Sequence, residues 1–201
     1  VVRGRIYDRN GKLIVDNTPS KVIYYKKPSK ITTEQEIKTA YKLADMIQID
    51  NKLNDYDFKV FWIKNNKDKA NEKITKEEWK KLDERKLTSD DIYKLKIERI
   101  TEDDLIIYDD HDKKAAYIYT LMNTGYSYAE KVIKSESVTD EEYALVSENI
   151  SELKGINTKL DWERTYPYGD AFKSLLGTVS SRKSGIPLEL KDYYLDKGYT
   201  L

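Results

Sequence analysis

The fold is most strongly constrained by the stretch Arg3-Gly4-Arg5-Ile6-Tyr7-Asp8-Arg9-Asn10-Gly11-Lys12-Leu13. Short apolar segments flank Asn10-Gly11 on both sides, and Leu13-Ile14-Val15 extends the second of them. Asn-Gly tolerates the positive φ angles of a type I′ turn, whose twist matches that of the flanking strands. The pattern therefore predicts a β-hairpin over residues 5–15 with a type I′ turn at Asn10-Gly11.

Further strands are expected on both sides of a long central region. Asp16-Asn17-Thr18-Pro19 predicts the end of the second hairpin strand, because Asx residues and proline favour turns. Val22-Ile23-Tyr24-Tyr25 predicts a separate strand before Pro28. After Gly155 the pattern predicts strands at residues 156–160, 162–166 and 175–179, and a short helix from Pro187 to Gly198.

The central region carries helical signals, because its apolar period changes from two to 3.6. Thr33-Glu34-Gln35-Glu36 reads as a capping box, as do Thr75-Lys76-Glu77-Glu78 and Thr139-Asp140-Glu141-Glu142. Thr88 or Ser89 caps another helix, and Thr101 a further one. Helices are therefore expected over residues 33–47, 55–64, 75–82, 89–99, 101–108, 113–123 and 139–150, with Gly155 stopping the last one.

These elements together predict an α+β fold. A small, discontinuous, antiparallel-rich β pedestal is expected from residues 1–30 plus 151–201, and a mostly helical head is inserted over residues 31–150. Charge signs alternate densely over residues 64–104, which is typical of solvent-exposed helices. The aromatic side chains of Trp62, Trp79 and Tyr93 indicate either a core, which we favour, or an exposed contact patch.

The composition excludes several classes of function. Lys and Arg number 36 and so do Asp and Glu, so no net charge draws the chain toward nucleic acid or anionic lipid. The absence of cysteine excludes disulfides, thiolate catalysis and cysteine-ligated zinc. No apolar run approaches the roughly 18–20 residues of a membrane span. The chain opens on Val1 without a starting Met, and we expect it to be part of a larger protein.

Short motifs of serine acyltransferases occur near the C-terminal end. Ser147-Glu148-Asn149 fits S-x-N, Ser151-Glu152-Leu153-Lys154 and Ser180-Ser181-Arg182-Lys183 fit S-x-x-K, and Lys183-Ser184-Gly185 fits K-[TS]-G. The first two motifs are predicted to lie on neighbouring turns of one helix, whereas a catalytic cleft needs its groups on different walls. We expect no catalytic residue here. Ser151 and Lys154 are expected to form a solvated pair, and residues 183–185 are expected to form a surface turn.

An acidic segment surrounds the single histidine. Asp109-Asp110-His111-Asp112 offers oxygen ligands for a hard cation, but it lacks the spaced loop and terminal glutamate of an EF-hand. We interpret it as a solvated turn between helices and expect neither a metal nor another cofactor. A lone histidine without a nucleophile motif also predicts no catalytic triad.

Motifs at both ends of the chain resemble one protein family. Residues 3–13 resemble the R-G-x-I-x-D-R-N-G-x-x-L segment of class B penicillin-binding proteins. The segments Trp162-Glu163-Arg164-Thr165-Tyr166-Pro167-Tyr168-Gly169 and Leu175-Leu176-Gly177-Thr178-Val179-Ser180-Ser181 resemble later motifs of the same family. Residues 185–187 and 192–199 look like the approach to its next pedestal motif, which is expected just beyond Leu201. Residues 122–126 also resemble this family, and residues 31–120 resemble it less.

The resemblance implies a non-catalytic N-terminal pedestal, or dimerisation region, with an inserted head. It assigns the scaffold to Arg3, Gly4, Asp8, Arg9, Asn10, Gly11, Arg164, Tyr166 and Gly177. Arginine binds carboxylates and carbonyls bidentately, so Arg3, Arg9 and Arg164 are expected to clamp Asp8 or backbone carbonyls and stiffen the pedestal.

The resemblance also implies the role of the parent protein. It resembles a monofunctional D,D-transpeptidase of the Gram-positive elongation type, held on the extracytoplasmic face of the membrane by an N-terminal transmembrane helix that this chain lacks. Expected partners are the downstream transpeptidase domain, a polytopic membrane glycosyltransferase, other wall-synthesis proteins and a second copy of the chain, but no nucleic acid. Two alternatives stay open: a freestanding wall-associated adhesion or sensor module, and an enzyme acylated at Ser151 or Ser180.

Overall fold

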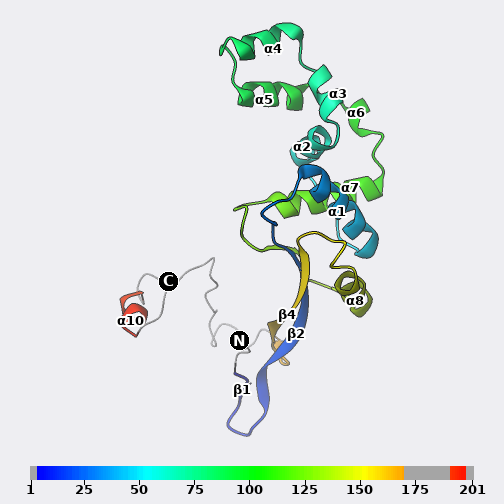
Figure 1. Cartoon of the computed structure of the whole chain (residues 1–201). Helices are drawn as coiled ribbons and strands as arrows, with labels where there is room; N and C mark the ends of the chain where they lie inside the picture. Colours follow the sequence, from blue (N-terminus) through cyan, green and yellow to red (C-terminus); the bar gives the residue numbers. More distant parts are fainter. Residues whose placement is uncertain (1–3, 170–190, 198–201) are drawn as a thin grey trace. The chain divides into compact units, whose positions relative to one another are not determined.

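The computed structural model describes residues 4–169 and 191–197 (Figure 1). The chain forms two compact units, one from Val1–Pro19 with Trp162–Leu201 and the other from Ser20–Asp161. The elements are β1 (Ile6–Tyr7), β2 (Leu13–Tyr25), α1 (Thr33–Met46), α2 (Asp55–Asn65), α3 (Lys67–Glu72), α4 (Lys76–Asp83), α5 (Ser89–Arg99), α6 (Glu102–Leu105), α7 (Asp110–Asn123), β3 (Lys131–Lys134), α8 (Asp140–Glu148), β4 (Ile156–Thr165) and α10 (Lys191–Asp196).

The predicted hairpin is present in the first unit, but its turn type was predicted wrongly. β1 and β2 pair antiparallel, with Ile6 opposite Val15. The Gly11 amide donates to the Asp8 carbonyl at 3.0 Å, and the Asp8 amide donates to the Lys12 carbonyl at 2.8 Å. A type I′ turn needs positive φ at both central residues, whereas here Gly11 has φ +79° and Asn10 is not left-handed. The loop is therefore three residues long, with Gly11 in its left-handed position.

Both long strands are more continuous than the sequence indicates. Residues 16–19 were predicted to end a strand, but β2 runs unbroken from Leu13 to Tyr25. Pro19 is exposed in this strand, and an exposed strand position tolerates the missing amide proton. β4 is likewise one strand over Ile156–Thr165 where two were predicted, and it pairs with β2.

The second unit contains helices α1 to α8 and an apolar core. α1 and α7 lie side by side, and their inner faces pack with the sheet residues (Figure 1). Trp62 is 2% exposed, so its interpretation as a core residue is confirmed, while Trp79 and Tyr93 are half-buried. The largest fully buried side chains include Tyr25, Ile23, Leu43, Ile47, Phe61, Ile118, Met122, Leu153 and Ile156.

Most helix starts agree with the predicted caps, and the differences have local causes. The first capping box uses Thr32 with Gln35, one residue earlier than predicted. α7 begins at Asp110 because Asp109 and Asp112 form its capping box. α6 ends at Leu105 and α8 at Glu148, both shorter than expected. The short elements α3 and β3 were not predicted.

The predicted α+β class with an antiparallel sheet is confirmed. β2 pairs antiparallel with β1 and with β3, and β4 also pairs with β2. Strand residues from both ends of the sequence thus flank the helical segment, as a discontinuous sheet requires. Within the part of the chain described, no helix is long and apolar enough to cross a membrane.

Candidate functional site

The Asp8 carboxylate organises the hairpin turn. Its Oδ1 accepts hydrogen bonds from the amides of Asn10, at 2.8 Å, and Lys12, at 2.7 Å. Aspartate commonly stabilises turns by binding backbone amides just downstream. Four predicted scaffold residues, Asp8, Arg9, Asn10 and Gly11, therefore belong to one turn, which is held by Asp8 and by the positive φ of Gly11.

A cross-strand ion pair supports the same hairpin. Arg5 Nε donates to Asp16 Oδ1 at 2.7 Å, and the Asn17 amide donates to the same oxygen at 2.8 Å. The Asn17 amide, followed by the Arg5 guanidinium, holds the pKa of Asp16 below its ordinary value. This pair was not predicted, although it follows from the register: Ile6 lies opposite Val15, so Arg5 lies opposite Asp16.

The C-terminal motif adds contacts in the same unit. Thr18 Oγ1 donates to Thr165 Oγ1 at 3.2 Å, and Lys12 Nζ lies 4.7 Å from the centre of the Tyr168 ring. Tyr168 raises the pKa of Lys12. The Tyr166 carbonyl accepts from the Gly169 amide at 2.9 Å.

The predicted arginine clamp stays a prediction. Arg164 is half-buried, and its Nη1 atom is buried with no hydrogen-bond acceptor among the residues that the structure describes. Gly4 is exposed. Arg3 and Gly177 lie outside the described residues, as do Ser180 and the Lys183-Ser184-Gly185 motif.

The serine motifs near α8 do not share one helix, contrary to the prediction. Ser147 is on α8, and its hydroxyl lies 2.8 Å from that of Thr158. Ser151 and Lys154 lie in turns after the helix has ended at Glu148. Leu153, which lies in these turns, is buried in the core.

The acidic segment around His111 caps a helix. The Asp112 amide donates to Asp109 Oδ1 at 2.8 Å, and the Asp109 amide donates to Asp112 Oδ2 at 3.0 Å. Tyr41 donates its hydroxyl to Asp112 at 2.7 Å, and His111 Nε2 lies 2.8 Å from Asp45 Oδ1. Across residues 4–169 and 191–197, no group of three or more potential ligands is arranged to hold a metal ion.

A buried polar cluster in the second unit was not predicted. Glu36 is 2% exposed and its Oε1 accepts a hydrogen bond from the Tyr25 hydroxyl at 2.7 Å, and Lys27 Nζ lies 2.9 Å from the same oxygen. Burial, and then the hydrogen bond to Glu36, raise the pKa of Tyr25 far above its ordinary value. The cluster connects β2 to α1 and fixes the strand against the helix.

A groove of about 680 Å³ lies between residues 48–52 and the segment from β3 to α8. Glu142 on its wall accepts from the Gln48 amide at 2.6 Å and from Lys134 Nζ at 2.7 Å. Burial opposes ionisation of Glu142, but Lys134 and the backbone amides outweigh it and lower its pKa. Lys134 and Glu142 in this groove are thus paired with each other.

The whole chain, residues 1–201, matches the penicillin-binding protein dimerisation domain. The chain belongs to this family. The resemblance to class B penicillin-binding proteins of Gram-positive bacteria is thereby confirmed.

Individual relatives agree in sequence and in fold. The chain is 40% identical over 201 residues to penicillin-binding protein 2A of Bacillus subtilis (strain 168), which covers 100% of this chain and 28% of that protein. It is 34% identical over 227 residues to penicillin-binding protein H of the same strain, with 98% and 31% covered. The solved structure of penicillin-binding protein 2B from Streptococcus pneumoniae (strain R6) matches with a TM-score of 0.70 and 26% identity, over 100% of this chain and 30% of that one. The chain thus spans less than a third of the length of these relatives.

Proposed function

We propose that this chain is the non-catalytic, extracytoplasmic pedestal of a class B penicillin-binding protein of the elongation type that acts in peptidoglycan synthesis. Residues 1–30 and 151–201 form the pedestal, and residues 31–150 form the head. A transpeptidase domain in the same protein carries the reactive serine, and the pedestal holds that domain at the right height above the membrane.

One topological observation carries this proposal. Residues from both ends of the chain, 1–19 and 162–201, belong to one compact unit, and residues 20–161, which include helices α1 to α8, form the other. A membrane anchor before the chain and a catalytic domain after it would thus both attach to the same unit. This is the connectivity that a stem needs.

Stiffness is the second requirement of a stem, and the first unit supplies groups suited to it. The Asp8 carboxylate fixes the turn through two backbone amides, and Arg5 pairs with Asp16 across the strands. The exposed ion pair contributes little by itself, since solvent screens it. The backbone ladder and the Asp8 turn therefore carry most of the rigidity.

The proposed partners follow from the family. They are the linked transpeptidase domain, a second copy of the chain, a polytopic membrane glycosyltransferase and other wall-synthesis proteins. A freestanding wall-associated module is the alternative, and the sequence that follows Leu201 in the gene distinguishes the two.

The positioning role is tested in the longer protein with Asp8→Ala. We expect the purified variant to react with a fluorescent penicillin at the wild-type rate, because Asp8 lies outside the catalytic domain. In cells, peptide cross-linking should fall, because the stem has lost its turn. Asp8→Asn keeps an oxygen acceptor and serves as the matched control.

Two results would count against the proposal. Unchanged peptide cross-linking in the Asp8→Ala strain would contradict the proposed role of the pedestal in positioning the transpeptidase domain. A stable fluorescent band on the isolated chain, lost in Ser151→Ala or Ser180→Ala, would instead favour an enzyme acylated within this chain.

A further inference from the structure

The second unit carries an open apolar groove of about 400 Å³, which is distinct from the scaffold residues above. Its apolar lining comes from α2 and α6 and from the residues next to them, namely Leu53, Phe58, Leu105 and Ile106. Its polar rim consists of Asn51, Asn54, Asp55, Glu102 and Lys113. The volume lies near the lower end of the range, roughly 300–1,000 Å³, that ligand clefts occupy. A groove of this volume can hold a few side chains of a partner, but not a whole helix or strand.

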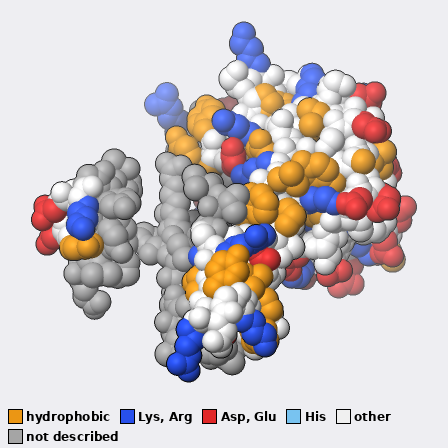
Figure 2. All heavy atoms as spheres, turned by 90° about the horizontal axis from the view of Figure 1, so that it is seen from below, with side chains coloured by type: hydrophobic (Ala, Val, Ile, Leu, Met, Phe, Trp, Pro, Cys, Tyr) orange, Lys and Arg blue, Asp and Glu red, His pale blue; other side chains and the backbone are white. Residues whose placement is uncertain are grey.

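Ile106, which lines this groove, is followed by a second isoleucine, Ile107. Ile106 is 79% exposed and Ile107 is 65% exposed. Single exposed apolar residues are ordinary on protein surfaces. Figure 2 shows hydrophobic side chains beside charged ones on the face that it draws. An exposed Ile-Ile pair continuous with an apolar groove is different, because it extends the apolar surface outward and marks a contact site.

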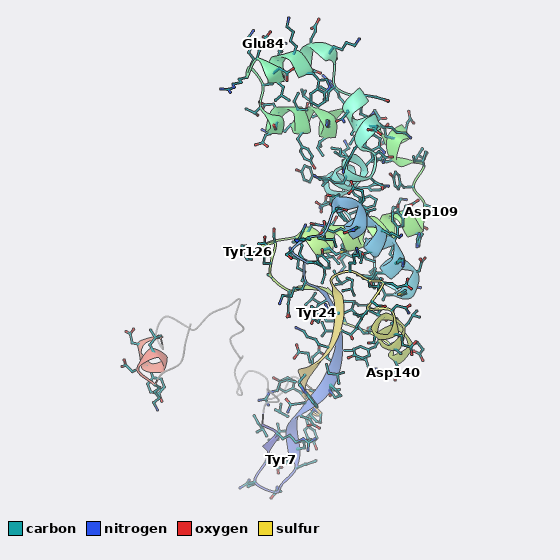
Figure 3. The ribbon with its side chains drawn as sticks, viewed as in Figure 1. Tyr7, Tyr24, Glu84, Asp109, Tyr126 and Asp140 are labelled. Carbon is teal, nitrogen blue, oxygen red and sulfur yellow. The ribbon has the colours of Figure 1, made fainter. Side chains whose placement is uncertain are left out.

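The turn that presents the isoleucines is firmly held. Tyr108, which follows them, is 8% exposed, and its hydroxyl accepts from Asn66 Nδ2 at 2.6 Å. On the other side, Trp62 Nε1 donates to the Asp104 carbonyl at 3.1 Å. Asp109 then caps α7 directly after the turn (Figure 3). Ile106 and Ile107 are therefore exposed by a fixed backbone, and a preorganised surface of this kind loses little entropy on binding.

The surroundings of the groove are acidic. The segment 101–112 contains six carboxylates and no lysine or arginine. Several of these carboxylates are already used, since Asp104 pairs with Lys73 and Asp109 caps α7. Asp55, Glu102 and Asp103 are exposed and have no ion pair within the described ranges. Lys113, the cation of the rim, lies 3.8 Å from Asp110, so the rim keeps a net negative charge.

We propose that this acidic-rimmed groove binds an amphipathic helical segment of a partner protein, whose leucine-like side chains are interleaved with Lys or Arg. The groove walls are helices and a turn, so no strand edge is available there for pairing with an extended peptide. A helix can place its apolar side chains at i, i+3 or i+4, and i+7 into such a groove while its cations reach the rim. The acidic rim disfavours both an anionic lipid surface and the same face of a second copy. The inference does not depend on the function proposed above.

The test uses the chain and a synthetic, fluorescently labelled helical peptide of about four turns, with leucines at helical spacing and lysines elsewhere. We expect saturable binding in fluorescence polarisation that weakens as salt is raised. A peptide with glutamate in place of every lysine should bind at least about tenfold more weakly, because it faces the acidic rim.

Protein variants place the binding at the groove. The double variant Ile106→Ser/Ile107→Ser should bind the lysine peptide at least about tenfold more weakly. Leu160→Ser removes an apolar side chain that is 59% exposed elsewhere, and it should bind like wild type. Asp55→Asn/Glu102→Gln should lower both the affinity and its salt dependence, whereas Glu136→Gln, an exposed carboxylate outside the groove, should change neither.

Other outcomes overturn the proposal. If the Ile106→Ser/Ile107→Ser and wild-type chains bind the lysine peptide equally well, the peptide binds at another surface. If the wild-type chain does not bind the peptide at all, the groove is not a site for such a helix. Sedimentation with phosphatidylglycerol vesicles that the same double variant abolishes would assign the surface to lipid. A monomer–dimer equilibrium in analytical ultracentrifugation that the double variant abolishes would assign it to a second copy.

Discussion

Gly155 leaves no room for a side chain beside Tyr25, since a Cβ atom on Gly155 would lie 2.5 Å from Cε2 of Tyr25. The same Cβ would also lie 2.9 Å from the Lys26 carbonyl oxygen and 2.9 Å from Pro28 Cδ. The Gly155 carbonyl accepts from the Lys26 amide at 2.8 Å, so β2 and the start of β4 approach each other here. Glycine is required at this position both by space and by its φ of +86°.

Gly155→Ala should therefore lower the free energy of unfolding by about 3 kcal/mol, because overpacking adds to the strain of a left-handed residue. Gly125→Ala is the matched control: Gly125 has φ +70° but no atom within 4 Å of the added Cβ, so about 1 kcal/mol is expected. Urea unfolding followed by circular dichroism measures both. If both variants lose the same free energy of unfolding, the close approach of residue 155 to Tyr25 does not affect stability.

The hydrogen bond from Tyr25 to Glu36 gives a second prediction. Tyr25→Phe should lower the free energy of unfolding by about 2 kcal/mol, because it removes a buried bond to a charged acceptor. Combined with Glu36→Gln in a double-mutant cycle, the two changes should couple by about 1 kcal/mol. Tyr41→Phe removes a similar bond, to Asp112, at a half-buried site, and it should cost less. Strictly additive effects of the Tyr25 and Glu36 changes would argue against a direct interaction.

Local signals in the sequence predicted the parts of the fold that depend on neighbours in the chain. The capping boxes of Thr75 with Glu78 and of Thr139 with Glu142 form hydrogen bonds between residues three positions apart, so they can be predicted from the sequence alone. The Asp8 turn is local in the same way. The Asp8 turn also lies within the first family motif, residues 3–13.

Features that depend on distant partners were missed. β3 is four residues long, begins and ends with lysine, and becomes a strand by pairing with Ile23 to Tyr25, over a hundred residues away. Glu36 stands in the first turn of a helix, where carboxylates are usually solvated, but the packing of β2 against α1 buries it beside Tyr25. Ile106 was predicted to lie in a helix over residues 101–108, but α6 ends at Leu105.

The Arg99–Glu78 pair between α4 and α5 predicts an acid dependence. Arg99 donates to both oxygens of Glu78, at 2.7 and 2.6 Å. The Arg99 bonds, followed by the Thr75 amide, lower the pKa of Glu78 from 4.5 to about 2. The unfolded chain therefore protonates Glu78 at a higher pH than the folded chain does. The stabilisation is complete above about pH 4.5 and is lost as the pH falls toward about 2.

Glu78→Gln removes this titrating group, so its stability should fall less steeply than that of wild type between about pH 5 and pH 2.5. Thermal unfolding followed by tryptophan fluorescence measures the effect, since Trp79 lies on α4. Glu77→Gln removes an exposed neighbour on the same helix and should retain the wild-type slope. If both variants keep the wild-type slope, Glu78 does not control acid unfolding of this segment.

The Asp8 turn gives the last prediction. Asp8→Ala removes the acceptor for the amides of Asn10 and Lys12, so both amides should exchange with solvent about tenfold faster, as expected for loss of a bond worth about 1.5 kcal/mol. Asp8→Asn keeps a side-chain oxygen in the same position and should retain most of the protection. Hydrogen–deuterium exchange resolved by NMR measures the two amides directly, and the Tyr25 amide in the second unit serves as an internal reference that should not change. Identical exchange rates in the alanine and asparagine variants would mean that the backbone, with Gly11 at φ +79°, holds the turn without the carboxylate.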